Sequence, residues 1–226
     1  MMTDLAKQLK EGTKESHSAA ENTKFVASFL RGALDPTEYR KLITNFYYVY
    51  DTMEQRIRET EDPLVKQIHY PVLERKDALE KDLEYYYGPE WKDQQIPSEA
   101  CNQYCYRINE LVDDTEYLLI AHHYTRYIGD LSGGQILKGI VERVLQPPVG
   151  KGLNFYEFPE VPDAKEFKVN YRATLDSMGV DQSKINALIA EANYAFRLNM
   201  YMFEELEGSA IKALLKVLCS FVKGKG

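Results

Sequence analysis

The chain has 226 residues and a formal net charge of −7, with 44% hydrophobic and 28% charged residues. These values are typical of one globular domain with a substantial core, and the acidic balance argues against nucleic acid as the main partner. The N-terminus has no apolar stretch of signal-peptide length, and the sequence has no run of about 18 apolar residues that would predict a membrane span. Three cysteines, an odd number, fit a reducing compartment.

Helical periodicity and capping residues predict about eight helices joined by short loops. The clearest start lies at Asp35, which precedes Pro36 at the first helical position and Glu38 at the third. A few residues within 153–158 are expected to be extended. The predicted helices cover approximately residues 4–30, 35–57, 62–70, 74–87, 97–112, 114–145, 163–178 and 181–207. The sequence therefore predicts a single all-α domain over residues 1–226, with a short amphipathic tail at 208–226. Docking of this tail on the domain is favoured over a place on a membrane surface.

Glycines are concentrated in the middle of the helix predicted at 114–145. Three of them lie within six residues, which weakens a helix by roughly 3 kcal/mol. At helical spacing one face is shared by Arg126, Gly129, Asp130 and Gly133. This face has few side chains, but it carries an ionisable residue of each sign. Such a face accepts a second helix or a flat ligand against its backbone. Spacing alone favours helix packing, whereas the two ionisable residues, which a dry helix crossing would leave unpaired, keep the ligand hypothesis open.

A second candidate site lies on the first predicted helix, where Lys10, Lys14, His17 and Glu21 fall within one helical stripe. His17 offers a nitrogen ligand, and Glu21 is placed one turn later to orient its ring, as carboxylates do around metal-bound histidines. Taken alone, the same stripe also fits a solvated face with ordinary ion pairs.

Two further pairs carry chemistry-bearing side chains. Lys168 and Arg172 lie one helical turn apart and are suited to clamp a carboxylate or phosphate, although an exposed basic face has the same pattern. His122 and His123 point about 100° apart on a helix, so they cannot share one metal ion, and at least one of them is expected to be structural.

A long motif in the glycine-rich stretch resembles a known family. Residues 124–135 read Tyr-Thr-Arg-Tyr-Ile-Gly-Asp-Leu-Ser-Gly-Gly-Gln, which is closely similar to the signature of biliverdin-producing heme oxygenases. The resemblance extends over nearly the whole chain, from about Leu5 to Leu206. It is strongest at residues 10–17, 20–22, 85–91, 167–172 and 195–199.

The resemblance implies an all-α fold that holds heme b between a proximal and a distal helix. His17 matches the proximal iron ligand, and Glu21 matches the carboxylate that hydrogen-bonds to it. Gly129 and Gly133 match distal glycines whose backbone approaches the heme face, so the resemblance favours a flat ligand over helix packing.

The resemblance also assigns the remaining site residues. Asp130 matches a distal carboxylate that organises water together with Tyr50, Arg126 and Asn199. The residues expected on the propionate side are Lys10, Lys14, Tyr124, Lys168 and Arg172. Further heme contacts are expected from Thr125, Ser132, Gly134, Phe196 and Phe203.

The implied activity treats heme as both cofactor and substrate. Molecular oxygen, with electrons expected from reduced ferredoxin, opens the ring at the alpha-meso carbon to biliverdin IX-alpha, carbon monoxide and ferrous iron. No membrane anchor follows the tail, so the chain is expected to be a soluble monomer of the bacterial or plastid type, in the cytoplasm or a plastid stroma. Two alternatives are a heme carrier without turnover and a heme-free helical enzyme similar to thiaminase-type proteins. A carrier does not need the polar distal set, and the heme-free enzyme does not need His17 together with the glycines.

Overall fold

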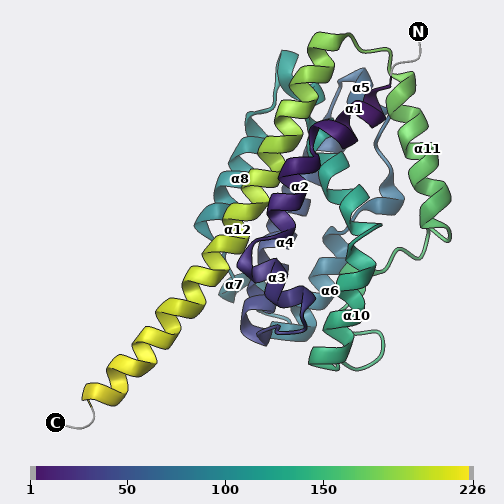
Figure 1. Ribbon diagram of the computed structural model, residues 1–226. Coiled ribbons are helices and arrows are strands. Elements are labelled where there is room, and N and C mark those ends of the chain that lie inside the picture. The colour runs from purple at the N-terminus through teal and green to yellow at the C-terminus, as the bar shows by residue number, and fades with distance from the viewer. Residues whose placement is uncertain (1–3, 224–226) are drawn as a thin grey trace.

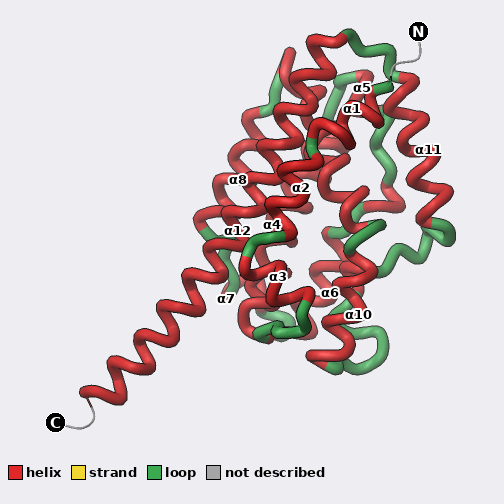
Figure 2. Tube along the Cα trace, viewed as in Figure 1, coloured by secondary structure: helices red, strands yellow, loops and turns green. Residues whose placement is uncertain are grey.

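The computed structural model describes the backbone of residues 4–223 and the side-chain surroundings of residues 4–207. Every regular element in the described part of the chain is helical, which confirms the all-α prediction (Figure 2). The α-helices are α1 (Leu5–Gly12), α2 (Lys14–Glu21), α3 (Lys24–Leu30), α4 (Pro36–Glu59), α5 (Pro63–Lys66), α6 (Lys76–Tyr87), α7 (Trp91–Gln94), α8 (Glu99–Glu110), α9 (Leu119–His123), α10 (Gly134–Leu145), α11 (Ala164–Ser177) and α12 (Gln182–Lys223). The shorter elements are the 3₁₀ helices η1 (Pro71–Leu73), η2 (Asp113–Leu118) and η4 (Asn154–Tyr156), and the π-helix η3 (Tyr124–Ile128).

Helix α4 illustrates how the sequence directs the fold. The Asp35 side chain accepts hydrogen bonds from the backbone N–H groups of Thr37 (2.7 Å) and Glu38 (3.1 Å), so the predicted N-cap is confirmed. One face of α4 is buried along its length, including Ile43, Tyr50 and Met53. That face packs against α6 and α8, while α12 packs against α1, α2, α3, α8 and α9 (Figure 1). The core therefore lies between α4 and α12. Helix α9 is buried within it, whereas α2 lies at its edge.

The structure has more helical segments than the eight predicted, in part because the predicted helices at 4–30 and 114–145 are interrupted. The first helix breaks at Thr13 and again at Thr23, whose side chain caps α3 by accepting from the backbone N–H of Val26. Gly12 lies at the first break, where an added Cβ would come within 2.6 Å of Ile189 on α12. A glycine at this position lets the chain pass close to α12.

Three other elements differ from the sequence prediction. The extended stretch predicted within 153–158 is wrong at residues 154–156, although Glu157 is extended. Residues 154–156 form η4, because the Asp82 carboxylate accepts hydrogen bonds from the backbone N–H groups of Asn154 (2.9 Å) and Phe155 (2.8 Å). Helix α7 was not predicted. Helix α12 continues past residue 207 to Lys223 (Figure 1).

The predicted docking of the 208–226 tail falls on side chains outside the described residues. In the described part of the chain, no helix combines the length and apolar character needed to cross a bilayer.

Candidate functional site

The glycine-rich stretch does not form the continuous helix that its periodicity predicts. Helix α9 passes into the π-helix η3, a short helical piece carries Gly129 and Asp130, and a turn at residues 131–133 precedes α10. We call residues 124–133 the distal segment. A π-helix inserts extra backbone into each turn, so it rotates the residues that follow by comparison with an α-helix of the same length. The π-helix therefore helps to decide which side chains of the distal segment face inward.

Two adjoining cavities, of about 220 Å³ and 340 Å³, lie between the distal segment, α2 and α12. Both are lined by His17, Gly129, Gly133 and Phe196, so they form one continuous slot. The first cavity is mostly apolar. Its aromatic lining residues are Phe25, Phe29, Phe46, Phe155, Tyr156, Phe196 and Phe203. The second cavity is lined by three cationic side chains, Lys10, Lys14 and Arg172. This division suits a ligand with an apolar body and an acidic edge.

The glycine face is open to the slot. A Cβ added to Gly129 would meet no described atom within 4 Å, and one added to Gly133 would meet only the Gly129 carbonyl oxygen, at 3.8 Å. Among the described residues, no atom of another helix lies within 4 Å of the Cβ added at either glycine. The helix-packing interpretation favoured by spacing alone is therefore wrong, and the slot has room for a flat group against the backbone.

His17 lies across the slot from the two glycines. Its Nδ1 is 3.7 Å from Oε2 of Glu21, and its ring makes an edge contact with Phe196, with ring centroids 5.7 Å apart. Because Glu21 faces Nδ1, Nε2 is the ring nitrogen available to a ligand. The His17 side chain is 57% exposed, as a residue on the wall of an open slot would be.

A buried polar network lies beneath the distal segment. Tyr50 donates a hydrogen bond from its hydroxyl to Oδ2 of Asp130, and Arg126 donates from Nε to the Tyr50 hydroxyl oxygen (3.0 Å) and from Nη1 to Oδ1 of Asn199 (2.5 Å). The Arg126 Nη2 atom is 3.8 Å from Oδ1 of Asp130. Burial raises the pKa of Asp130, although Arg126 and Tyr50 favour the ionised form. Arg126 and Asp130 line the apolar cavity. Tyr50 is linked to it through both of them, and Asn199 through Arg126.

Most of the other predicted contacts also line the slot. Those not yet placed are Thr125, Tyr124 and Ser132 in the cationic cavity and Gly134 in the apolar one. The Thr125 hydroxyl is buried and has no hydrogen-bond partner among the described residues. Lys168 is the exception: it lines neither cavity, and its Nζ instead donates to the Ser132 hydroxyl (3.0 Å) and the Leu131 carbonyl oxygen (3.3 Å).

Comparison with known proteins decides the family, because the heme oxygenase family matches residues 3–205. The chain belongs to the heme oxygenase family. It is 48% identical over 222 residues to a heme oxygenase of Rhodella violacea, an alignment that covers 98% of this chain and 94% of that protein. Among solved structures, heme oxygenase-1 of the cyanobacterium Synechocystis in complex with heme has a TM-score of 0.89 and 43% identity, covering 97% of this chain and all of that one. Heme oxygenase-2 of Synechocystis, in complex with heme and NO, has a TM-score of 0.90 and 42% identity, covering 94% and 88%.

Apart from Phe196 and Phe203, the aromatic lining of the slot was not predicted from the sequence. Phe25, Phe29, Phe46 and Phe155 follow helical or local apolar spacing, which does not distinguish a cavity wall from a closed core. An apolar residue acquires this role only from what faces it across the fold.

His122 and His123 are both buried, and neither lines the slot. Nε2 of His122 is 2.9 Å from Oε1 of Glu191, and Nδ1 of His123 is 2.8 Å from the Tyr171 hydroxyl. The two rings therefore have separate partners, as their different directions on a helix require. Their contacts hold α9 against α12 and α11.

Proposed function

We propose that the slot binds heme b and that this member of the heme oxygenase family opens its ring at the alpha-meso carbon. The products are biliverdin IX-alpha, carbon monoxide and ferrous iron. The observation that carries the proposal is the slot itself: His17 faces the bare backbone of Gly129 and Gly133 across a cavity with an apolar half and a cationic half. When bound, heme supplies the iron at which molecular oxygen is activated.

The proximal side has the geometry needed to hold an iron ligand. His17 presents Nε2 to the slot, while Glu21 faces Nδ1 and is placed to accept its proton, which fixes the tautomer. Lys10, Lys14 and Arg172 are placed to pair with the two propionate groups of heme. The aromatic residues of the other half exclude water from the porphyrin body.

On the distal side, room and proton supply are provided by different residues. Gly129 and Gly133 leave the heme face uncovered by side chains. Asp130 lies beside that face, and its carboxyl group is suited to orient a water molecule and to exchange a proton with it. Tyr50 and Asn199 fix the Arg126 guanidinium, which in turn keeps a positive charge next to Asp130.

We further propose that the chain is a monomer and that reduced ferredoxin supplies the electrons, in the cytoplasm or a plastid stroma. Support comes from the high similarity to algal and cyanobacterial heme oxygenases. The free thiols of Cys101 and Cys105 are consistent with such a reducing compartment.

One experiment separates this proposal from its rivals. The protein is incubated with hemin, ferredoxin, ferredoxin–NADP reductase and NADPH while the visible spectrum is recorded. Loss of the Soret band together with growth of biliverdin absorption supports the enzyme. A persistent Soret band identifies a heme carrier, and the absence of any Soret shift on hemin addition identifies a heme-free protein. Chromatography of the product tests the alpha isomer.

The assignment of His17 predicts a specific loss. His17→Ala is expected to take up hemin, because burial in the apolar half supplies much of the affinity, but to lose nearly all turnover. Added imidazole is expected to restore part of the activity by occupying the vacated ligand position. His69→Ala, which changes a histidine outside the slot, is the matched control. Native turnover by His17→Ala without imidazole would show that the assignment is wrong.

A further inference from the structure

Behind the distal segment, the buried carboxylate of Glu54 lies where three elements meet. It belongs to α4, and its Oε1 accepts hydrogen bonds from the Tyr127 hydroxyl of η3 (2.7 Å) and from the backbone N–H of Arg75 (2.5 Å). Its Oε2 accepts from the backbone N–H of Lys76, the first residue of α6 (3.2 Å). Glu54 is only 2% exposed. One carboxylate therefore ties the distal segment to two other helices, and we call this set of contacts the Glu54 junction.

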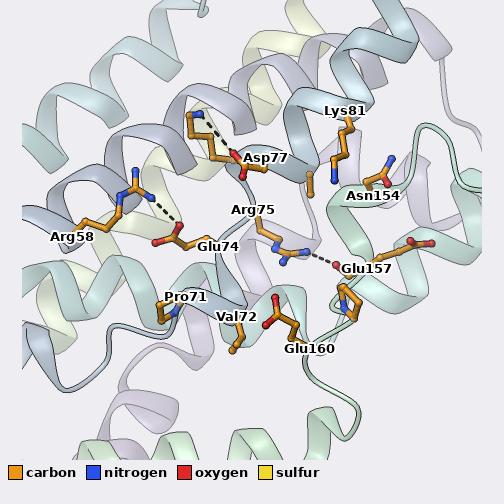
Figure 3. Close-up of a pocket in the computed structure, with 13 residues that line it drawn as sticks. Arg58, Pro71, Val72, Glu74, Arg75, Asp77, Lys81, Asn154, Glu157 and Glu160 are labelled. Carbon is orange, nitrogen blue, oxygen red and sulfur yellow. Dashed lines mark hydrogen bonds and ion pairs between the residues drawn. The ribbon is translucent and has the colours of Figure 1, made fainter.

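The Arg75 side chain fixes the α6 end of the Glu54 junction. Nε donates to the Leu73 carbonyl oxygen (2.8 Å), Nη1 donates to the Glu157 carbonyl oxygen, and the guanidinium lies 3.9 Å from the ring centroid of Phe158. Figure 3 shows Arg75 reaching toward Glu157 in a cavity of about 460 Å³, separate from the heme slot. Because Arg75 is held on several sides, the start of α6 gives Glu54 a rigid support.

Tyr127 connects the Glu54 junction to the proposed site. It lies in the π-helix between Arg126 and Asp130, is 1% exposed, and makes an edge contact with Tyr50, with ring centroids 5.6 Å apart. Tyr50 in turn donates to Asp130. A π-helix is rare and less favourable than an α-helix, so external contacts are needed to keep this register. The bond from the Tyr127 hydroxyl to Glu54 is such a contact.

The electrostatics of Glu54 argue that it is more than a helix cap. Burial raises the pKa of Glu54 to about 7, opposed by the hydrogen bonds from Arg75 and Tyr127. An exposed cap at the start of α6 would give those N–H groups an acceptor without this desolvation cost. The buried position is the one that also reaches Tyr127.

We propose, on the basis of the proposed function, that Glu54 is a positioning residue of the heme site. Through Tyr127 it holds the π-helical register in which Arg126 and Asp130 face the slot. Neither Glu54 nor Tyr127 lines the slot, so both act through the backbone of the distal segment.

Tyr127→Phe tests the proposal, because it removes one hydroxyl and leaves the ring and both backbone bonds to Glu54. In the heme-free protein, amide hydrogen exchange of residues 124–133 is expected to accelerate about five- to tenfold, the effect of losing one hydrogen bond of about 1 kcal/mol. Exchange in α8 is expected to stay unchanged. In the turnover assay kcat is expected to fall several-fold, while hemin affinity stays within about twofold of wild type.

Tyr47→Phe is the matched control, since Tyr47 is also a buried tyrosine that donates to a glutamate, Glu80 (3.1 Å), but lies away from the distal segment. It is expected to leave the exchange of residues 124–133 unchanged. Glu54→Gln keeps an acceptor oxygen for Tyr127, so it is expected to accelerate exchange in residues 124–133 less than Tyr127→Phe does.

The outcomes are distinguishable. Unchanged exchange of residues 124–133 in Tyr127→Phe overturns the proposal, even if turnover falls, because the hydroxyl would then not act through position. Faster exchange throughout all helices also overturns it, because that result indicates general destabilisation. If the wild-type protein does not degrade heme, the proposed function fails, whereas the exchange experiment still decides whether Glu54 fixes the distal segment.

Discussion

Gly133 presents backbone to the slot where a side chain would enter it. Gly133→Leu is therefore expected to weaken hemin binding roughly ten- to hundredfold, since overpacking of this kind costs about 1–3 kcal/mol. A Soret titration measures the change. Gly139→Leu is the control, because Gly139 lies on α10 facing open space but outside the slot. Equal losses in the two variants would contradict the assigned role.

Asp130 is expected to affect turnover rather than binding, because its carboxylate belongs to the polar network and contributes little apolar contact. Asp130→Ala is expected to bind hemin nearly as wild type does and to lose most biliverdin formation, with peroxidase activity on an added phenol appearing instead. Asp130→Asn is expected to be milder if the hydrogen bond from Tyr50 and the 3.8 Å contact with Arg126 survive. Biliverdin yield and hemin affinity are measured together. A large loss of affinity without loss of yield per bound heme would reverse the assignment.

Among single residues of the candidate site, the polar ones were predicted from the sequence better than the apolar ones. His17 and Glu21 share a stripe whatever the fold is, and the structure places them 3.7 Å apart across one turn of α2. Arg126 and Asp130 were likewise found from their spacing beside glycines. The partners Tyr50 and Asn199 came only from the family resemblance, because they lie 76 and 73 residues from Arg126 and no local pattern joins them.

Among the helices, capping chemistry was predicted more reliably than helix continuity. Asp35, Asp62, Ser98 and Asp163 all cap helices where the sequence placed a start, because each acceptor side chain is followed directly by the N–H groups that it binds. The π-helix η3 was not predicted. Its register depends on bonds from Tyr127 to Glu54 and from Arg126 to Asn199, which link segments distant in sequence. A periodicity of 3.6 residues contains no information about such bonds.

Helix α11 contributes two cations that the sequence treated as one clamp, and the structure separates their contacts. Arg172 lines the cationic cavity, whereas Lys168 holds the turn at Ser132. Heme rotation decides which meso carbon is attacked, so the double variant of Lys168→Ala with Arg172→Ala is expected to broaden the biliverdin isomers beyond alpha. Arg172→Ala alone is expected to account for most of the change. Chromatography of the products measures it, and alpha isomer alone from the double variant would count against this role.

Although the whole molecule has a negative net charge, it contains a local cationic site. The net charge of −7 excluded few partners by itself. Lys10, Lys14 and Arg172 come together only because α11 packs beside α1, from whose end α2 continues (Figure 1). Composition and periodicity were enough to predict an all-α chain. The slot depends on the packing of α2, α12 and the distal segment, which only the family resemblance anticipated.

The stability of the whole fold is expected to depend on pH through His123, which joins α9 to α11. Burial lowers the pKa of His123 from 6.5 to about 3, with a smaller contribution from His69, and its Nδ1 is hydrogen-bonded to Tyr171. Between these two values the unfolded chain binds a proton at His123 that the folded chain does not. The contribution of the neutral His123 ring to the free energy of unfolding is therefore at its full value above pH 6.5. It is lost as the pH falls toward 3.

From these pKa values, His123 is expected to contribute about 2 kcal/mol less to the free energy of unfolding at pH 5 than at pH 8. Urea unfolding of wild type and His123→Gln at both pH values isolates this contribution. The carboxylates titrate alike in the two proteins, so their effect cancels in the difference. His123→Gln is expected to be the less stable protein at pH 8, because it loses the ring contacts with Tyr127 and Tyr171. Its deficit is expected to shrink by about 2 kcal/mol at pH 5. A deficit that is the same at both pH values would show that His123 takes up its proton as readily in the folded protein as in the unfolded chain.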